Sequence, residues 1–438
     1  MTKYAPEILI LSIFVSSASL LLLINKAVYS PELLQNVAPE YSWLIDGFIN
    51  LLCYSTILIP GYLVYKYIKK INYLDKAVGN NCIVTLIQKC FQEDESLDRT
   101  VSATQTASQR TECNTAIRLL FYFVCLQLSL VSWGVLQEKV THEYVNEKKE
   151  VGVFKDSQFL VFINRILAFT ISGIVMCLRR QPRHKCPMYK YVFCSLSNIL
   201  SSWCQYEALK YVSFLHQVLA KAAKTIPVMI MGRIVSRTKY EKYEYITACV
   251  LSAGMLFFMW DTGNDKDTST SITTFSGAIL LCSYIAFDSF TTNWQGALYT
   301  QYSMTPIQMM CAVNLFSCCF TAVSLFQQGS FIHSLNFMIK FPRFIVDCVL
   351  LSICSAVGQL FIYSTIADFG PLVFAIISTI RQGFSVIMSC ILFEHEVHSL
   401  GIFGLFLVFL SLFFRIYCSH RSKVLRKRAR INNESIKH

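Results

Sequence analysis

The sequence predicts an all-α polytopic membrane protein, with a core of ten helices in two inverted five-helix repeats after an N-terminal pair of hydrophobic segments. Three observations predict this class. Of 438 residues, 54% are hydrophobic and only 15% are charged, whereas about a quarter of the residues in a soluble domain are charged. Apolar segments long enough to cross a bilayer follow one another along the chain. Their spacing in the first half recurs in the second.

The N-terminal pair lies in residues 1–68. Ile8–Ile24 is an apolar run after a short polar start, so a cleaved signal peptide is one reading of it. The run continues past the small residues Ser16–Ser19, which favours a retained anchor. Trp43–Ile68 is long enough to span. Residues 69–116 form a polar cytosolic linker, rich in acids, Ser, Thr and Gln, whose centre is expected to be poorly ordered.

Ten apolar segments follow, and five of them fall in each of the two expected domains, 117–260 and 261–417. They are Ile117–Leu136, Phe159–Leu178, Tyr191–Leu209, Phe214–Val235, Tyr243–Trp260, Phe275–Thr292, Ile307–Phe326, Phe344–Ile366, Pro371–Phe393 and Leu400–Tyr417.

The predicted architecture depends on an internal repeat. Only Lys210–Ser213 separates the third segment from the fourth, and only Ala367–Gly370 separates the eighth from the ninth. When these short connections are aligned, Tyr206 meets Tyr363 and Lys224 meets Arg381. An odd number of spans in each half gives the two halves opposite orientations, as in the inverted repeats of transporters.

The charge of the loops indicates the orientation. Basic residues crowd Arg179–Lys190, Arg233–Lys242 and the tail 418–438, whereas Asp261–Asp267 is acidic. Cytosolic loops carry the excess of Lys and Arg, so the tail is expected in the cytosol. The net charge of +12 is therefore explained by membrane orientation, and no nucleic-acid partner is expected.

The sequence contains no recognisable catalytic or metal-binding motif. Many of the 18 cysteines lie inside apolar segments, as small hydrophobic residues do. There is no Cys-x-x-Cys or His-Glu-x-x-His spacing and no set of nucleophile, His and acid. We expect no enzyme activity, no metal and no cofactor.

Lys221 and Lys224 are the strongest candidates for a binding site. They lie one turn apart near the middle of the apolar stretch Phe214–Arg237. An ammonium group at membrane depth costs a few kcal/mol unless it faces protein, water or an anion. Gln217 lies on the same helix face, and two like charges repel unless an anion lies near them. The pattern predicts a cavity that receives an anion.

Two further cations lie inside predicted spans. Arg381, beside Gln382, either binds substrate or forms a structural ion pair, for which Asp288 or Glu207 is available. Arg165 in the second segment either lines the same cavity or pairs with an acid.

Polar and aromatic residues within the spans are less specific. Gln205, Tyr206, Tyr363 and Asn314 are of types that more often form hydrogen bonds between helices than contact a ligand. Each is nevertheless a candidate substrate contact: Asn314 is an even choice between the two roles, and Tyr206 and Tyr363 are plausible aromatic partners for a purine, because adenine stacks on Tyr.

Long stretches of the sequence resemble the nucleotide-sugar transporter family of the drug/metabolite transporter superfamily. Within it they resemble the branch that carries the sulfate donor 3′-phosphoadenosine 5′-phosphosulfate (PAPS). The stretches include SNILSSWCQYEALKYVSFLHQVLAKAAKTIPVMIMG, YIAFDSFTTNWQ, IQMMCAVNLFSCCFT, LLSICSAVGQLFIYSTIADFG and STIRQ, and the resemblance covers about Leu119–Tyr417. The Lys-x-x-Lys of the family falls on Lys221 and Lys224, whereas Leu215-His216 departs from its pattern.

The resemblance implies the activity. It implies a multi-pass Golgi membrane protein that moves PAPS from cytosol to lumen in exchange for an adenosine nucleotide. The alternative is a related exchanger of ATP and ADP or of nucleotide sugars. The expected partners are the nucleotide and membrane lipid, with a second copy of the chain as a further candidate.

Overall fold

The structure is a computed structural model, and the residues that it describes make up most of the chain. These are residues 5–28, 42–73, 82–91, 112–141, 143–145, 151–154, 157–179, 181–182, 184–208, 211, 221, 224–263, 275–302, 304–392, 401–404, 406–411, 413–415, 417–418 and 421–422.

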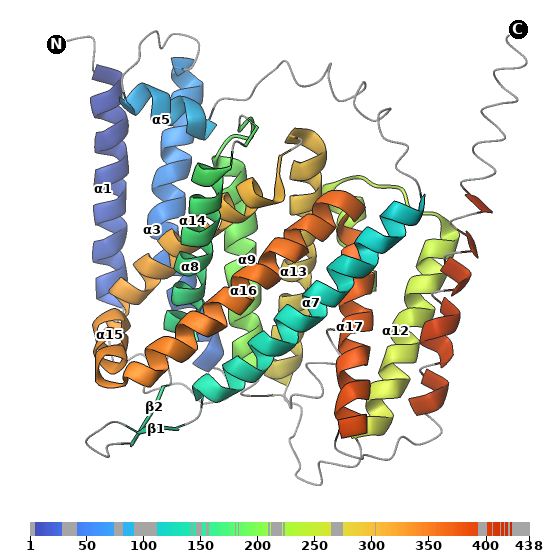
Figure 1. Ribbon diagram of the computed structural model, residues 1–438. Coiled ribbons are helices and arrows are strands. Elements are labelled where there is room, and N and C mark those ends of the chain that lie inside the picture. The colour runs from blue at the N-terminus through green and yellow to red at the C-terminus, as the bar shows by residue number, and fades with distance from the viewer. Residues whose placement is uncertain are drawn as a thin grey trace, which may run out of the picture. The chain divides into compact units, whose positions relative to one another are not determined.

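The described chain is almost entirely helical (Figure 1). Six helices are long and apolar enough to cross a membrane, among the residues described. Its elements are α1 (Ala5–Val28), α3 (Ser42–Ile71), α5 (Cys82–Phe91), α7 (Glu112–Thr141), β1 (Glu143–Val145), β2 (Val151–Val153), α8 (Ser157–Leu178), α9 (Tyr189–Ala208), α11 (Thr225–Val235), α12 (Lys242–Gly263), α13 (Phe275–Tyr302), α14 (Pro306–Gln327), α15 (Ser330–Lys340), α16 (Pro342–Phe369) and α17 (Pro371–Leu392).

Two compact units share these elements. Unit 1 contains residues 1–199 and 298–367, and unit 2 contains residues 200–297 and 368–438. Each unit therefore combines residues from both halves of the chain.

Unit 1 is built around the pair α8 and α14. Alpha-helix α3 packs against α14, and α1 packs against α3, as the parallel blue helices in Figure 1 show. Tyr54 of α3 meets Phe320 of α14 edge to face, with ring centroids 5.8 Å apart. The N-terminal pair of hydrophobic segments is therefore part of this unit.

One end of unit 1 joins the α8–α9 connection to the start of α14. Thr305 caps α14 in a capping box with Gln308, whose Nε2 also donates to Pro182 O at 2.6 Å. Lys190 Nζ donates to Tyr302 Oη at 2.6 Å. Two connections therefore lie at the same end of unit 1: the one between the second and third expected spans, and the one between the sixth and seventh. This is expected if successive spans cross the membrane in opposite directions.

The helix α5 lies at the same end. It falls inside the expected linker 69–116, and its Lys89 O accepts a hydrogen bond from Met188 N at 3.3 Å. Phe91 packs near Tyr65 of α3 and Tyr189 of α9, with ring centroids 5.8 and 6.2 Å away. This part of the linker is therefore an amphipathic helix; residues 92–111 lie outside the described residues.

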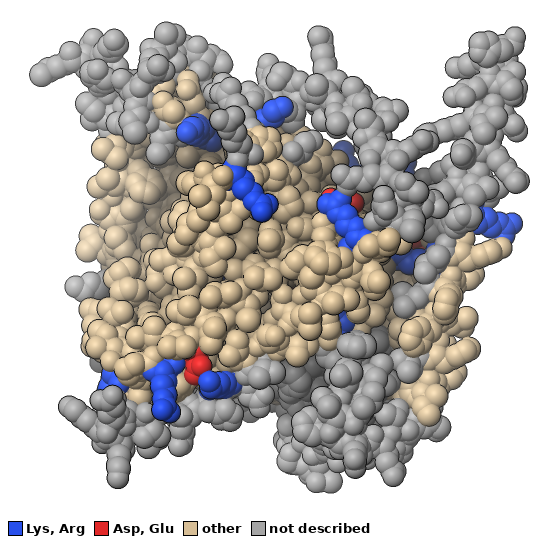
Figure 2. All heavy atoms as spheres, in the orientation of Figure 1, with Lys and Arg blue, Asp and Glu red and all other residues tan. Residues whose placement is uncertain are grey.

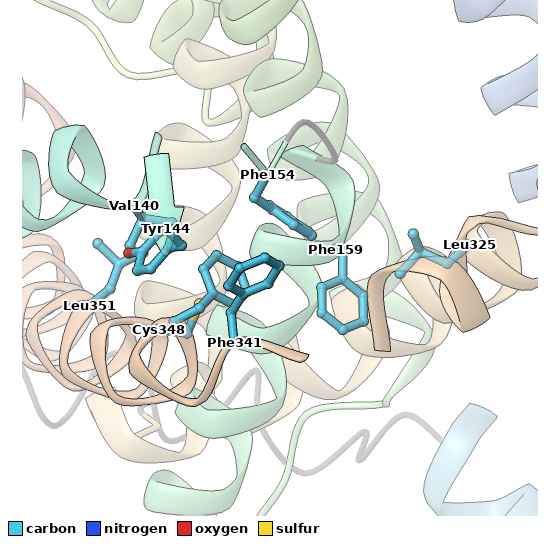
Figure 3. Packing of buried hydrophobic residues seen from close by; sticks show 9 residues of the cluster. Val140, Tyr144, Phe154, Phe159, Leu325, Phe341, Cys348 and Leu351 are labelled. Atoms are coloured by element: carbon cyan, nitrogen blue, oxygen red, sulfur yellow. The ribbon is translucent and has the colours of Figure 1, made fainter. Parts of the chain in front are cut away.

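The opposite end of unit 1 holds an aromatic cluster under the hairpin β1–β2 (Figure 3). Phe154 and Tyr144 approach Phe344 of α16, with ring centroids 4.7 and 5.3 Å away. Asp347 accepts hydrogen bonds from Tyr144 Oη at 3.0 Å and from Lys139 Nζ at 2.8 Å. The hairpin is a small addition to the helical architecture that the sequence predicts, and its β-branched Val145, Val151 and Val153 favour extended pairing.

The uncharged belt expected of membrane helices is visible in the space-filling view. Figure 2 shows Lys and Arg side chains mainly toward the ends of the helices of unit 1, while the surface between them is largely uncharged.

Unit 2 packs α11 against α12 and α17, and α12 also packs against α17. Asn293 of α13 donates from Nδ2 to Val228 O of α11 at 2.9 Å. The hydroxyls of Thr225 and Thr379 lie 3.3 Å apart and join α11 to α17. Gly370, with φ of 85°, ends α16 in the left-handed conformation that glycine adopts without strain, and Pro371 begins α17. The expected connection Ala367–Gly370 thus shortens to one residue.

Helical residues of the described part of the chain fall within each of the ten apolar segments expected after residue 117. Some bounds differ: α13 continues from the expected end at Thr292 to Tyr302. The described part of the fourth segment is Lys221 and residues from Lys224 onward; its start lies outside the described residues. Helical residues within Gly401–Arg415 occupy the tenth segment.

Candidate functional site: a cationic cluster in unit 2

Lys224 lies directly before α11, and it is the most constrained of the candidate cations. Its side chain is 8% exposed, and its Nζ forms an ion pair with Asp288 Oδ2 of α13 at 2.5 Å. The same ammonium lies 4.9 Å from the centroid of the Phe374 ring on α17. A desolvated ammonium gains from both partners, since opposite charge and an aromatic face each stabilise it.

Lys221 lies one turn before Lys224 and faces a different partner. Its Nζ lies 5.8 Å from the centroid of the Tyr284 ring. Lys221 is also within electrostatic range of Arg381, Asp288 and Lys224. The two lysines therefore face the same group of side chains on α13 and α17, as the spacing in the sequence predicts.

Tyr284 and Asp288 are residues of α13 that contact the two lysines. They are four residues apart, which places them on one helix face. Tyr284 is buried, and it lies within electrostatic range of both Asp288 and Arg381. Ser201 Oγ of α9 donates to its backbone oxygen at 3.4 Å. The sequence-based prediction missed Tyr284 and Phe374 as site residues; the spacing of Tyr284 to Asp288 was the available signal.

The cluster carries more positive than negative charge. Lys221, Lys224 and Arg381 contribute three cations, and Asp288 contributes one carboxylate that is paired with Lys224. Asp288, one of the two acids proposed as a structural partner of Arg381, is thus paired with a lysine. Lys224 and Arg381, which the predicted internal repeat aligns, both lie within electrostatic range of Lys221. Such an excess of buried positive charge can hold a multiply charged anion.

Three other predicted contacts lie in unit 1. Arg165 of α8 is 9% exposed and within electrostatic range of Cys318 and Tyr363. Asn314 of α14 donates from Nδ2 to Gln359 Oε1 of α16 at 3.1 Å. Among the described residues Arg165 has no carboxylate partner, so the ion-pair alternative for it gains no support there.

The remaining candidates are only partly described. Gln205 is half-buried on α9 in unit 2. Tyr206 and Gln382 lie in α9 and α17, but their side chains fall outside the described part, and Gln217 lies outside it altogether. Within the described ranges, no group of three or more His, Cys, Asp or Glu residues is arranged to hold a metal ion.

Comparison with known proteins identifies the family. The family model of the UAA transporters matches residues 118–419. The chain belongs to the UAA transporter family.

Relatives of this UAA transporter extend beyond the matched region. The chain is 47% identical over 421 residues to the adenosine 3′-phospho 5′-phosphosulfate transporter 1 of Drosophila melanogaster, and the match covers 93% of this chain and 90% of the relative. It is 47% identical to the Homo sapiens protein of the same name, covering 90% of this chain and 92% of the relative. The UDP-galactose/UDP-glucose transporter 5B of Arabidopsis thaliana is 37% identical, over 65% of this chain and 83% of the relative.

Proposed function

We propose that this UAA transporter moves PAPS across the Golgi membrane from cytosol to lumen in exchange for an adenosine nucleotide. The observation that carries the proposal is the identity of 47% to relatives named as transporters of this compound, over nine-tenths of the chain. In this proposal the chain is a carrier rather than an enzyme, and its substrate supplies sulfate to sulfation reactions in the lumen.

The chemistry of the cluster in unit 2 suits this substrate. PAPS carries about four negative charges at neutral pH, since it has both a 3′-phosphate and a phosphosulfate. Lys221 and Lys224 supply compact point charges, and Arg381 supplies a planar guanidinium that can bind two oxygens at once. Two unit-charge attractions at about 4 Å contribute several kcal/mol even at an effective dielectric near 20. We assign these three residues to the anionic groups.

The other expected contacts remain part of the proposal. Gln205, Tyr206, Gln217 and Gln382 accompany the cluster in sequence, and Arg165, Asn314 and Tyr363 are substrate contacts of unit 1. Tyrosine supplies a face for adenine.

The proposed architecture is the drug/metabolite transporter core of ten helices in two inverted repeats, 117–260 and 261–417, with a cytosolic tail. Helices at the expected segments support it, and so does the position of the α8–α9 and α13–α14 connections at one end of unit 1. Odd-membered repeats in opposite orientation supply the two states of alternating access.

A carrier of another nucleotide is the second candidate, because the UDP-galactose/UDP-glucose transporter 5B of A. thaliana is 37% identical. Uptake of labelled PAPS by proteoliposomes containing the purified chain separates the two. We expect unlabelled PAPS and adenosine 3′,5′-bisphosphate to compete strongly and UDP-sugars weakly. Strong competition by UDP-galactose, or no PAPS uptake, would overturn the proposal.

A further inference from the structure

Asn50 of α3 is the centre of a buried polar network in unit 1. It is 3% exposed, and its Oδ1 accepts hydrogen bonds from three side chains. Gln158 Nε2 of α8 donates at 3.0 Å, Gln328 Nε2 after α14 at 2.9 Å, and Ser324 Oγ of α14 at 3.2 Å. We call Asn50, Gln158, Ser324 and Gln328 the Asn50 network. Of these four residues, Asn50 alone lies outside residues 118–419, which the family model matches.

The network determines how three helices are aligned. Apolar contacts between helices tolerate small shifts along the axis, whereas a buried hydrogen bond requires its donor and acceptor within a few tenths of an ångström. Loss of the Asn50 acceptor would remove three hydrogen bonds that join α3 to α8 and α14. Gln328 Nε2 would keep Ser324 Oγ at 3.1 Å, and Ser324 Oγ would keep Gln158 Oε1 at 3.5 Å. A side chain of α3 thus adds to the alignment of α8 against α14, beside the direct and longer contact of Ser324 Oγ with Gln158 Oε1 at 3.5 Å.

The same helix faces carry polar side chains toward the middle of unit 1. Gln158 and Arg165 lie about two turns apart on α8, on the same face. Ser324 continues a stripe on α14 that includes Ser317 and Thr321, all buried and spaced by three or four residues. The alignment of Gln158 with Ser324 therefore also sets which part of α14 lies beside Arg165.

Arg165 depends on that alignment. Its guanidinium lies within electrostatic range of the Cys318 thiol of α14, and no carboxylate of the described residues anchors it by an ion pair. A long side chain without such an anchor takes its depth from its own helix.

We propose that Asn50 is a positioning residue, through which the N-terminal helix α3 sets the register of α8 against α14 and so the depth of Arg165. This inference rests on the proposed function, in which Arg165 contacts the transported nucleotide. It gives the N-terminal pair a role in transport: α3 acts on substrate affinity without touching substrate.

A double-mutant cycle tests the inference in proteoliposomes that contain the full chain. The variants are Asn50→Leu, Arg165→Gln, Lys221→Gln and the doubles that combine Asn50→Leu with each cation change. We expect Asn50→Leu and Arg165→Gln each to raise the KM for PAPS by about threefold or more. In the Arg165→Gln background Asn50→Leu should add almost nothing, whereas in the Lys221→Gln background its full factor should persist.

Thr56→Val is the matched control. Thr56 Oγ1 of α3 accepts a hydrogen bond from Gln327 Nε2 at 3.3 Å, so this variant removes an α3–α14 contact and leaves the link to α8 intact. It should leave KM unchanged. If Asn50→Leu does not fold, Gln158→Met breaks the same link from α8 and takes its place in the cycle.

Each outcome decides something. An equal factor for Asn50→Leu in both backgrounds, or a KM shift in Thr56→Val as large as in Asn50→Leu, overturns the positioning role. An unchanged KM in Arg165→Gln, with normal uptake by the unmodified chain, overturns it too. Failure of the unmodified chain to take up PAPS instead refutes the proposed function.

Discussion

At the scale of single residues, the ion pair between Lys224 and Asp288 allows the effect of a substitution on stability to be distinguished from its effect on transport. Removing Lys224 leaves a mostly buried carboxylate without its counter-charge, which is strongly destabilising. The side chain of Asp288 is 24% exposed, so solvent reduces this cost. Lys221 offers a contrast, because the pair of Lys224 with Asp288 persists when Lys221 is replaced.

We predict that Lys224→Met lowers both thermal stability, by about 2 kcal/mol, and PAPS uptake. Adding Asp288→Asn should restore stability and leave uptake low, because no bare carboxylate remains while the cation is still missing. Lys221→Met should lose uptake at nearly normal stability. Thermal unfolding of the purified variants and uptake in proteoliposomes measure both effects. Normal uptake by the stable double variant would remove Lys224 from the substrate site.

His184, in the connection between α8 and α9, predicts a pH dependence. Its Nε2 lies 2.9 Å from Tyr191 Oη, and burial lowers the pKa of His184 from its usual value near 6.5. Below that value the unfolded chain binds more protons than the folded chain, so stability falls as the pH decreases. Above it the contribution of His184 is fully present.

We expect the melting temperature to fall between about pH 6.5 and 5 more steeply in the unmodified chain than in His184→Gln. Scanning fluorimetry across this range measures the difference, with Lys185→Gln as the exposed neighbouring control. Parallel pH profiles of the unmodified chain and His184→Gln would contradict the assignment.

At the scale of helices, the close approach of α13 to the start of α17 places the cationic cluster. A Cβ at Gly296 would collide with the ring of Pro371. Tyr284 and Asp288 lie on α13, and Arg381 lies on α17, so the separation of these helices sets the distances within the cluster.

Gly296→Ala should therefore destabilise the protein by about 1–3 kcal/mol, as overpacking does, and lower uptake. Gly173→Ala in α8 is its control, because a Cβ there meets nothing within 4 Å and alanine favours a helix. Expression, thermal unfolding and uptake are compared for the two variants. A Gly296→Ala protein as stable and active as Gly173→Ala would show that the contact yields without consequence.

At the scale of the whole molecule, the two ends of unit 1 make the orientation testable. Lys185 is exposed at the end formed by the α8–α9 connection, and Lys340 is exposed at the end of α15. The distribution of Lys and Arg in the loops favours the cytosol for the first of these, and alternation of spans then places Lys340 in the lumen.

In sealed Golgi vesicles, an impermeant maleimide should label Lys185→Cys, and it should label Lys340→Cys only after detergent is added. The unmodified chain gives the background from native cysteines. The reverse pattern would place the tail 418–438 in the lumen and invert the proposed direction of transport.

The sequence alone determined the membrane class and the apolar segments in which the long helices lie, and it singled out the cationic residues as candidates. Apolar length and charge are local properties, and the cost of burying backbone and charge in a bilayer makes them decisive. The hairpin β1–β2, the helix α5 and the short α15 were not predicted, because short elements outside the spans depend on what they pack against.

Only the tertiary structure decided the partners. The sequence offered Asp288 or Glu207 as a partner of Arg381, whereas the structure pairs Asp288 with Lys224. Tyr284 and Phe374 became ring contacts of the lysines because α9, α13 and α17 place them there. Asn50 could not be linked to Gln158 and Ser324 from sequence, since hydrogen bonds between helices depend on register and rotation, which apolar periodicity along one chain does not encode.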